Sequence, residues 1–215
     1  MKLYKYLSDE TFAKYLDSYL RGEVYFSSWR DFNDPMEGYF TYVSRQNPKE
    51  DIREIIEQKS RYRVCCFCKS YKKFLQWSYY TNGHRGVCLE YNINKTNLPT
   101  YIIIKSVNYT KTLPSFNSAA SIEDQTKTFL LTKLKVWKPE NEVRILGHNI
   151  LDNTIQIGKL TGIIFGANFD ISDHNGEQRK QVRQNVLASG SNYPKLYNAV
   201  IDRITATISR RIIDQ

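Results

Sequence analysis

Apolar and polar residues alternate with a period of two in many short segments, the pattern of strands with one buried face. Residues 87–91, Val-Cys-Leu-Glu-Tyr, show this pattern directly after an Asn-Gly turn at Asn82 and Gly83. The same alternation, or a run of β-branched residues, predicts the other strands. These cover residues 3–7, 24–28, 38–43, 62–69, 101–109, 143–146, 154–157, 162–165, 196–202 and 204–213.

Apolar residues three and four positions apart predict helices between these strands. Ser8 is placed to cap the first helix and Gly22 to end it. Further helices are predicted at residues 48–61, 70–80 and 121–136, and a helix or helix pair at 171–189. We find no internal repeat and no linker. The expected fold is one α+β domain over residues 1–215, with a mixed or antiparallel sheet and flanking helices.

Composition adds a preference for negatively charged partners. The chain has 215 residues, 41% of them hydrophobic, which suits a globular domain with a sizeable core. Its net charge of +9 and pI near 9.3 favour nucleic acid, nucleotide phosphates or anionic lipid, with an indifferent basic surface as the alternative.

The cysteines predict neither a disulfide framework nor a metal site. Three of them, Cys65, Cys66 and Cys68, lie in one strand-like segment, and Cys88 lies in another. This is not the spacing of zinc ligands, so we expect small buried thiols in a reduced, cytoplasmic protein. No signal peptide and no apolar run of membrane-spanning length is present, so no membrane association is expected.

Residues 77–91 gather an unusual set of groups. Trp77 and Tyr80 precede the Asn-Gly turn, and His84 and Arg85 follow it at the mouth of a predicted strand. We expect the aromatic residues to form the floor of a cleft and the two basic residues its rim. The alternative is that the aromatic residues are core and the basic residues are surface.

A Glu-x-Glu pattern is the second candidate. In an extended segment Glu140 and Glu142 point to one face, and Arg144 extends the row. Such a row can act as an acid/base pair beside an arginine that orients a phosphate, or it can be a solvated charge pair. Sequence motifs for metalloproteases, dinucleotide-binding folds, P-loops and α/β-hydrolases are absent.

Several ordered motifs resemble a bacterial family catalogued as domain of unknown function 2971. They are Phe32-Asn33-Asp34-Pro35-x-Glu37, Trp77-x-x-Tyr80 with His84-x-Gly86-Val87-Cys88-Leu89, and Glu140-x-Glu142-x-Arg144. The resemblance runs from residue 3 to about residue 166. It implies no activity by itself.

A more distant resemblance is to mono-ADP-ribosyltransferases. The matching positions, in chain order, are Tyr4 or Lys5, Phe26-Ser27-Ser28 and Glu140-Asn141-Glu142-Val143. This chain departs from that pattern, because Lys5 replaces Arg or His and the second serine is adjacent rather than two positions on. The resemblance implies a split-sheet fold and NAD as the substrate.

The ADP-ribosyltransferase resemblance assigns roles to individual residues. Glu142 would stabilise the oxocarbenium-like state at the ribose, Glu140 would orient the acceptor, and His84 is a third catalytic candidate. The candidate NAD-binding residues are Tyr4, Lys5, Tyr6, Ser27, Ser28, Asn33, Asp34, Trp77, Tyr80, Arg85 and Arg144. The expected protein modifies a nucleic acid or a protein, as a toxin or phage-defence effector with an antitoxin or another protein partner.

Two other classes remain open. A nucleic-acid-binding or nuclease-type effector would use the basic charge, with Asp34, Glu37 and Glu142 as acidic groups. The other class is a non-catalytic interaction domain, in which neither the basic charge nor these acidic groups would serve catalysis or nucleic-acid binding.

Overall fold

The computed structural model describes residues 1–42, 48–172, 176–188, 190 and 193–213. Contacts divide the chain into two compact units, each assembled from separate stretches. Unit 1 comprises Met1–Val24, Phe67–Leu98 and Ile155–Gln215, and unit 2 comprises Tyr25–Cys66 and Pro99–Thr154. The chain therefore passes between the units several times, and residues of one unit come from distant parts of the sequence.

The strands form a large mixed sheet in the order β12-β11-β10-β4-β1-β3-β8-β5, with two small two-stranded sheets, β2-β9 and β6-β7. Strand β3 (Tyr62–Cys68) begins in unit 2 and ends in unit 1. Helices flank the sheet, so the expected α+β class is confirmed. No helix in the described part of the chain is long and apolar enough to cross a membrane.

Unit 1 is built around strand β4 (Val87–Asn92), whose first five residues are all buried. It pairs antiparallel with β1 (Lys2–Leu7) on one side and with β10 (Lys159–Phe165) on the other. The parallel neighbour of β10 is β11 (Lys195–Asp202), which pairs antiparallel with the last strand, β12 (Thr207–Ile212). The helices of unit 1 are α1 (Asp9–Lys14), α2 (Leu16–Leu20), α4 (Phe74–Tyr80), α6 (Phe169–Ser172), α7 (Glu177–Ala188) and the 3₁₀ helix η2 (Lys95–Asn97).

The predicted helix start and stop in the first of these segments are confirmed. The Ser8 side chain accepts a hydrogen bond from the backbone N–H of Thr11, which caps α1. The segment ends at Gly22, whose φ of +79° favours glycine, and a Cβ there would lie 2.0 Å from the carbonyl oxygen of Gly158. Between these points the helix is broken at Tyr15, so two short helices replace one.

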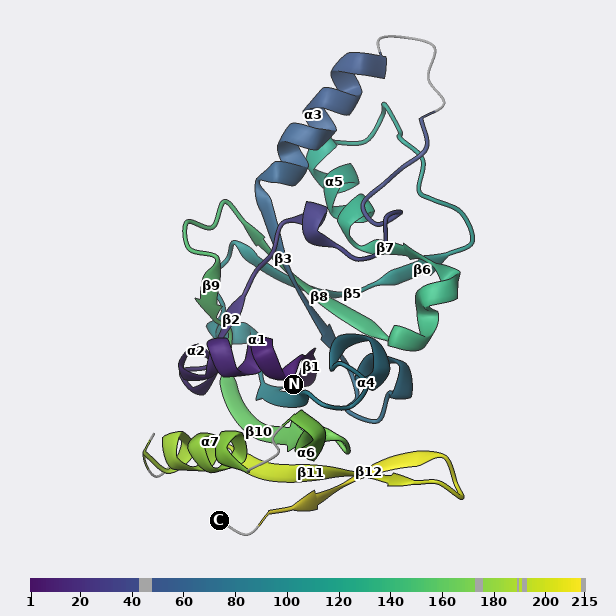
Figure 1. Cartoon of the computed structure of the whole chain (residues 1–215). Helices are drawn as coiled ribbons and strands as arrows, with labels where there is room; N and C mark the ends of the chain where they lie inside the picture. The colour runs from purple at the N-terminus through teal and green to yellow at the C-terminus, as the bar shows by residue number, and fades with distance from the viewer. Residues whose placement is uncertain (43–47, 173–175, 189, 191–192, 214–215) are drawn as a thin grey trace. The chain divides into compact units, whose positions relative to one another are not determined.

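Unit 2 contains α3 (Pro48–Ser60) and α5 (Ile122–Leu130), which lie side by side (Figure 1). Strand β5 (Ile102–Ser106) pairs antiparallel with β8 (Glu142–His148), and β6 (Asn108–Thr110) pairs parallel with β7 (Thr132–Leu134). The 3₁₀ helices η1 (Trp29–Asp31) and η3 (Lys135–Glu140) complete it. The small strands β2 (Glu23–Tyr25) and β9 (Thr154–Gln156) lie at the boundaries of the units.

The predicted helix at residues 121–136 and the predicted strand at residues 38–43 differ from the structure. The helix expected at residues 121–136 ends at Leu130, because residues 132–134 pair as a strand with β6. Residues 38–42 form no strand beyond one isolated bridge between Thr41 and Ser115, and the last residue of that prediction, Val43, lies outside the described residues. At residues 132–134 pairing with a distant segment overrides the local sequence preference.

Candidate functional site

Trp77 is the buried centre of the aromatic stretch in unit 1. Its indole N–H donates to the carbonyl oxygen of Tyr71 at 2.7 Å, and its ring meets Tyr6 edge-on at 5.2 Å. The Tyr6 hydroxyl donates in turn to the carbonyl oxygen of Ser70 at 2.9 Å. Tyr80 packs against the same apolar cluster. These aromatic residues are core, as the alternative reading of the sequence proposed.

His84 lies against Trp77 rather than at an open rim. Its ring stacks on the indole at 5.7 Å with an interplanar angle of 8°, and only 9% of the residue is exposed. Burial lowers the pKa of His84, which favours the neutral ring. Its φ of +68° is unusual for a residue with a side chain. Arg85, by contrast, is exposed as expected.

Two glycines fix the backbone around His84. A Cβ on Gly86 would lie 2.0 Å from the carbonyl oxygen of Leu7, and a Cβ on Gly166 would lie 2.0 Å from that of His84. The N–H of Gly166 donates to the carbonyl oxygen of Gly86 at 2.9 Å. Close backbone packing therefore fixes this loop. The surroundings of His84 are those of a residue that maintains the fold.

Glu90 and Arg210 form a polar centre in unit 1, which the sequence did not lead us to predict. Glu90 is buried and accepts hydrogen bonds from Arg210 at 2.7 Å, Thr161 at 2.9 Å, Lys2 at 3.1 Å and Tyr4 at 3.1 Å. Burial opposes its ionisation, but these donors hold the pKa of Glu90 at about 2. The signal in the sequence was a carboxylate inside an otherwise apolar strand.

Arg210 is enclosed by aromatic rings. Its guanidinium lies 4.2 Å from the ring centroid of Tyr197 and 5.0 Å from that of Tyr71. Tyr4 contacts Tyr71 at 5.7 Å and points to the same side of β1 as Tyr6, while Lys5 points to the other side and lies over the Phe67 ring at 5.5 Å. Of the three predicted residues on β1, only Tyr4 reaches this polar centre.

In unit 2 the predicted Glu-x-Glu-x-Arg motif forms a buried ion network, here called the Arg144 cluster: Glu37, Lys133, Glu140, Glu142 and Arg144. Arg144 donates to both carboxylate oxygens of Glu142, at 2.8 and 3.1 Å, and also to Glu37. Lys133 donates to Glu140 at 2.6 Å and lies 3.3 Å from Glu37. Three carboxylates thus share two cations inside the unit.

The local backbone differs from the extended segment that the sequence suggested. Glu140 ends η3, Glu142 begins β8, and Asn141 between them is left-handed with a φ of 50°. The two carboxylates therefore do not lie in one strand row, and that prediction is wrong. Both carboxylates nevertheless lie near the Lys133 amine, which is 2.6 Å from Glu140 and 3.8 Å from Glu142.

Burial and charge pairing act in opposite directions on the pKa values of the Arg144 cluster. Burial raises the pKa of Glu37 above its usual value, although Arg144 and Lys133 counteract it. For Glu142, burial is outweighed by Arg144, so its pKa is lowered. A buried carboxylate bound on both oxygens by one guanidinium is a structural ion pair, and its partner cannot be removed without leaving an unpaired charge.

The remaining predicted residues of unit 2 shape its loop at residues 26–38. Ser27 donates to the carbonyl oxygen of Val64 at 3.3 Å, and Ser28 caps η1. Asn33 is exposed at the predicted turn, and the buried Asp34 accepts from the N–H of Met36 at 3.0 Å. Glu37 then enters the Arg144 cluster, which ties the loop to β8.

Lys59, at the end of α3, is a buried amine of unit 2 that the sequence did not single out. It donates to the carbonyl oxygen of Gly38 at 2.6 Å and lies 3.4 Å from the Trp29 ring centroid. Burial, with a smaller contribution from Arg30, lowers the pKa of Lys59 to about 8.

The predicted site residues thus divide between the units. Those in unit 1 are Tyr4, Lys5, Tyr6, Trp77, Tyr80, His84 and Arg85, and those in unit 2 are Ser27, Ser28, Asn33, Asp34, Glu140, Glu142 and Arg144. Within the described residues, no group of three or more His, Cys, Asp or Glu side chains is arranged to hold a metal ion. The four cysteines, all in the described part, form no disulfide.

Comparison with known proteins finds a match to one family over part of the chain. No curated protein and no solved structure matches the chain, and no comparison shows the ADP-ribosyltransferase resemblance. One family model does match, over a segment that contains both the Trp77–His84 stack and Glu140, Glu142 and Arg144. Residues 76–145 match the family described as Protein of unknown function (DUF2971), the same family that the motifs indicated.

Proposed function

We propose that unit 1 binds single-stranded nucleic acid. The observation that carries this proposal is the unequal division of charge. Unit 1 holds 17 of the 31 Lys and Arg residues and 10 of the 22 Asp and Glu residues, a net charge of +7; unit 2 holds the other 14 and 12, a net charge of +2. A strongly basic unit attracts the phosphate backbone, and this attraction supplies most of the affinity in non-specific binding.

Burial strengthens the contrast between the two units. In unit 2, two of the cations are buried among the three carboxylates of the Arg144 cluster. In unit 1, Lys69 and Lys72 are exposed and Lys73 is partly exposed, just before α4. These lysines are available to meet phosphates.

Aromatic side chains beside these lysines favour a single strand over a duplex. Tyr71 lies between the lysines and is partly exposed, and Tyr79 on α4 is 63% exposed. Unpaired bases stack on such rings, whereas the bases of a duplex are already stacked on each other. The segment from Lys69 to Tyr79 therefore offers both phosphate and base contacts.

ADP-ribosyl transfer remains a prediction that the geometry of unit 2 does not favour. Glu142, the expected catalytic carboxylate, is 7% exposed and bound on both oxygens by Arg144. An assay for nicotinamide release from labelled NAD tests it directly.

The test of nucleic-acid binding is fluorescence anisotropy with labelled 20-nucleotide RNA and DNA strands across a salt series. We expect log Kobs to fall linearly with log salt, by about 0.7 per contacted phosphate. The double variant Lys72→Ala, Lys73→Ala should make this slope shallower by about 1.4, because two phosphate contacts are lost.

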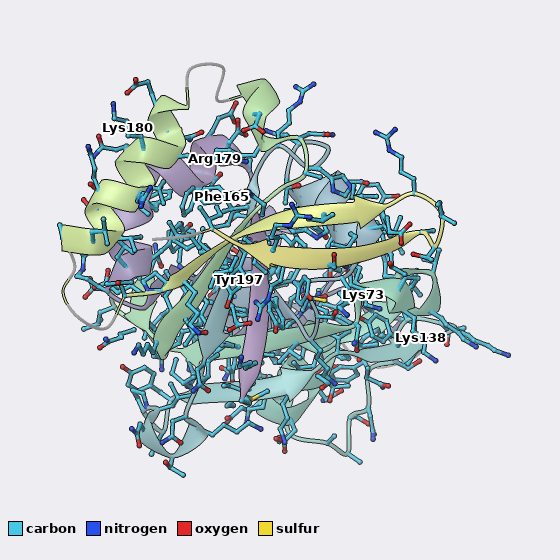
Figure 2. The ribbon with its side chains drawn as sticks, turned by 90° about the horizontal axis from the view of Figure 1, so that it is seen from below. Lys73, Lys138, Phe165, Arg179, Lys180 and Tyr197 are labelled. Carbon is cyan, nitrogen blue, oxygen red and sulfur yellow. The ribbon has the colours of Figure 1, made fainter. Side chains whose placement is uncertain are left out.

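Lys138→Ala provides the matched control, since Lys138 is an exposed lysine of unit 2 (Figure 2). Its salt slope should equal that of the wild-type protein. Absence of binding at 50 mM salt by the wild-type protein, or an equal change in slope for both variants, would contradict the proposal.

A further inference from the structure

A small recess of unit 1 lies between α7 and the strands β10 and β11, beside the residue that follows β12, and nothing described so far uses it. We call it the α7 recess; its volume is about 230 Å³. Figure 2 shows Arg179 and Lys180 of α7 beside Phe165 of β10. The lining residues are Phe165, Arg179, Lys180, Arg183, Leu196, Asn198 and Ile213.

Strand register places three different chemical groups in one row at this recess. Phe165 pairs with Asn198, and Asn198 pairs with Arg211. Paired residues of neighbouring strands point to the same face of a sheet, so an aromatic ring, a carboxamide and a guanidinium lie side by side. Tyr197 and Ala199 point to the opposite face, where they join the core around Trp77. The recess is therefore separate from the Glu90 and Arg210 centre.

The charge around the recess is one-sided. Three of its seven lining residues are cationic, none is acidic, and Arg211 is next to them. Arg179 pairs with Asp170 at 3.1 Å and lies over the Phe165 and Phe169 rings. The exposed Lys180, Arg183 and Arg211 form no ion pair with any carboxylate in the described part of the chain. A ligand with negative charge would neutralise them.

Asn198 supplies a polar group without a partner. Its Oδ1 atom is buried and accepts no hydrogen bond from any described residue. A carboxamide presents an acceptor on one side and an NH₂ donor on the other, so rotation about its last bond turns the donor toward an anion. Buried polar atoms are nearly always bonded, which points to a ligand or solvent partner here.

The volume and the charge of the α7 recess together indicate which ligand it binds. The recess is smaller than the roughly 300–1,000 Å³ typical of sites for whole small molecules. A phosphate group is small enough to enter it, and arginine side chains match its oxygens in a forked geometry. A terminal phosphate carries about −1.5 to −2 charges, more than a backbone phosphodiester, and only one of its oxygens carries a substituent.

We propose that the α7 recess binds the terminal phosphate of a nucleic-acid strand, through Lys180, Arg183, Arg211 and the carboxamide of Asn198. This inference rests on the proposed function, because it names the part of the strand that unit 1 recognises. The phosphate lies over the apolar floor of Leu196 and Ile213, where its attraction to the cations is less screened by water.

The experiment compares three internally labelled strands of one sequence, with a 5′-phosphate, a 3′-phosphate or hydroxyls at both ends. Anisotropy at 100 mM salt should show that one terminal phosphate increases affinity about tenfold, the effect of one or two charge-assisted hydrogen bonds. Arg183→Ala and Asn198→Leu should each remove this increase while leaving binding of the hydroxyl-ended strand largely intact. Arg203→Ala, at an exposed arginine in the β11–β12 turn, is the matched control and should retain it.

The outcomes separate this inference from the proposed function. Equal affinity for the three strands overturns the terminal-phosphate site but leaves nucleic-acid binding in place. A phosphate effect that persists in both Arg183→Ala and Lys180→Ala also overturns it, because the phosphate then binds elsewhere. Failure of all three strands to bind overturns both proposals. Circular dichroism melting of each variant confirms that it is folded, and Lys180→Ala alters an exposed side chain outside the core.

Discussion

The imidazole of His84 lies flat on the indole of Trp77, with ring centroids 5.7 Å apart and planes 8° apart. The pair joins α4 to the loop that leads into the central strand of unit 1. Because the backbone N–H of His84 also donates to the carbonyl oxygen of Trp77 at 3.1 Å, the contact is fixed at both backbone and side chain.

Replacing His84 with Asn tests this contact. Asn tolerates a positive φ, so the backbone is preserved while the ring stack is lost. We expect the free energy of unfolding to fall by about 1 kcal/mol, the contribution of an aromatic pair beyond its buried area. Urea denaturation measures it. Tyr79→Ala, which alters an exposed ring of the same stretch, should shift the midpoint far less.

The same histidine predicts a pH dependence. Burial lowers the pKa of His84 below 6.5, so the unfolded chain takes up this proton more readily than the folded protein. The stabilisation from the neutral ring is complete above pH 6.5 and is lost as the pH falls below that value. The stability difference between wild-type protein and His84→Asn should therefore narrow between pH 7.5 and 5.5. A constant difference would contradict this assignment.

In unit 2, Glu142→Gln should destabilise the fold strongly. The change leaves the buried Arg144 guanidinium with its main counter-charge removed, which typically costs about 3–5 kcal/mol. Guanidinium chloride is unsuitable because it screens ion pairs, so urea denaturation is the measurement. Glu57→Gln alters an exposed surface ion pair and serves as the control. An unchanged midpoint for Glu142→Gln would mean that this carboxylate is not structural.

Lys59 predicts a rise in stability at alkaline pH. Its pKa is lowered from 10.5 to about 8 in the folded protein, chiefly by burial. The unfolded chain therefore holds this proton longer, and stability should increase as the pH rises from about 8 toward 10.5. The Lys59→Met variant should not show this increase in stability with pH. Urea midpoints of both proteins at pH 7.5 and 9.5 give the comparison, and parallel changes would refute the prediction.

Replacing Tyr79 should change the affinity for nucleic acid without changing the stability of the fold. Its ring is 63% exposed, so Tyr79→Ala leaves the core intact. If bases stack on this ring, affinity for single strands should fall by about 1–3 kcal/mol, with an unchanged salt slope because no phosphate contact is lost. An anisotropy titration at two salt concentrations distinguishes this from loss of a charge.

The sequence predicted best what local pattern determines. The Ser8 cap, the glycine after α2 and the two strands of the C-terminal hairpin all follow from nearby residues. It failed where distant segments decide the structure. Residues 132–134 follow a helical pattern, yet they pair with β6. Glu90 and Arg210 are 120 positions apart, so no spacing rule could join them. The left-handed backbone at Asn141 likewise separates two glutamates that a strand pattern would align.

The position of β4 between β1 and β10 has a consequence for synthesis of the protein. β1 is available when β4 emerges from the ribosome, but β10, beginning at Lys159, is made only after all of unit 2's second stretch. Until then, this strand, whose first five residues are buried in the folded protein, has one unpaired edge. An unpaired edge of this kind recruits other chains. Nascent chains that stall before residue 159 should therefore depend on chaperones, and release of the completed chain should end that dependence.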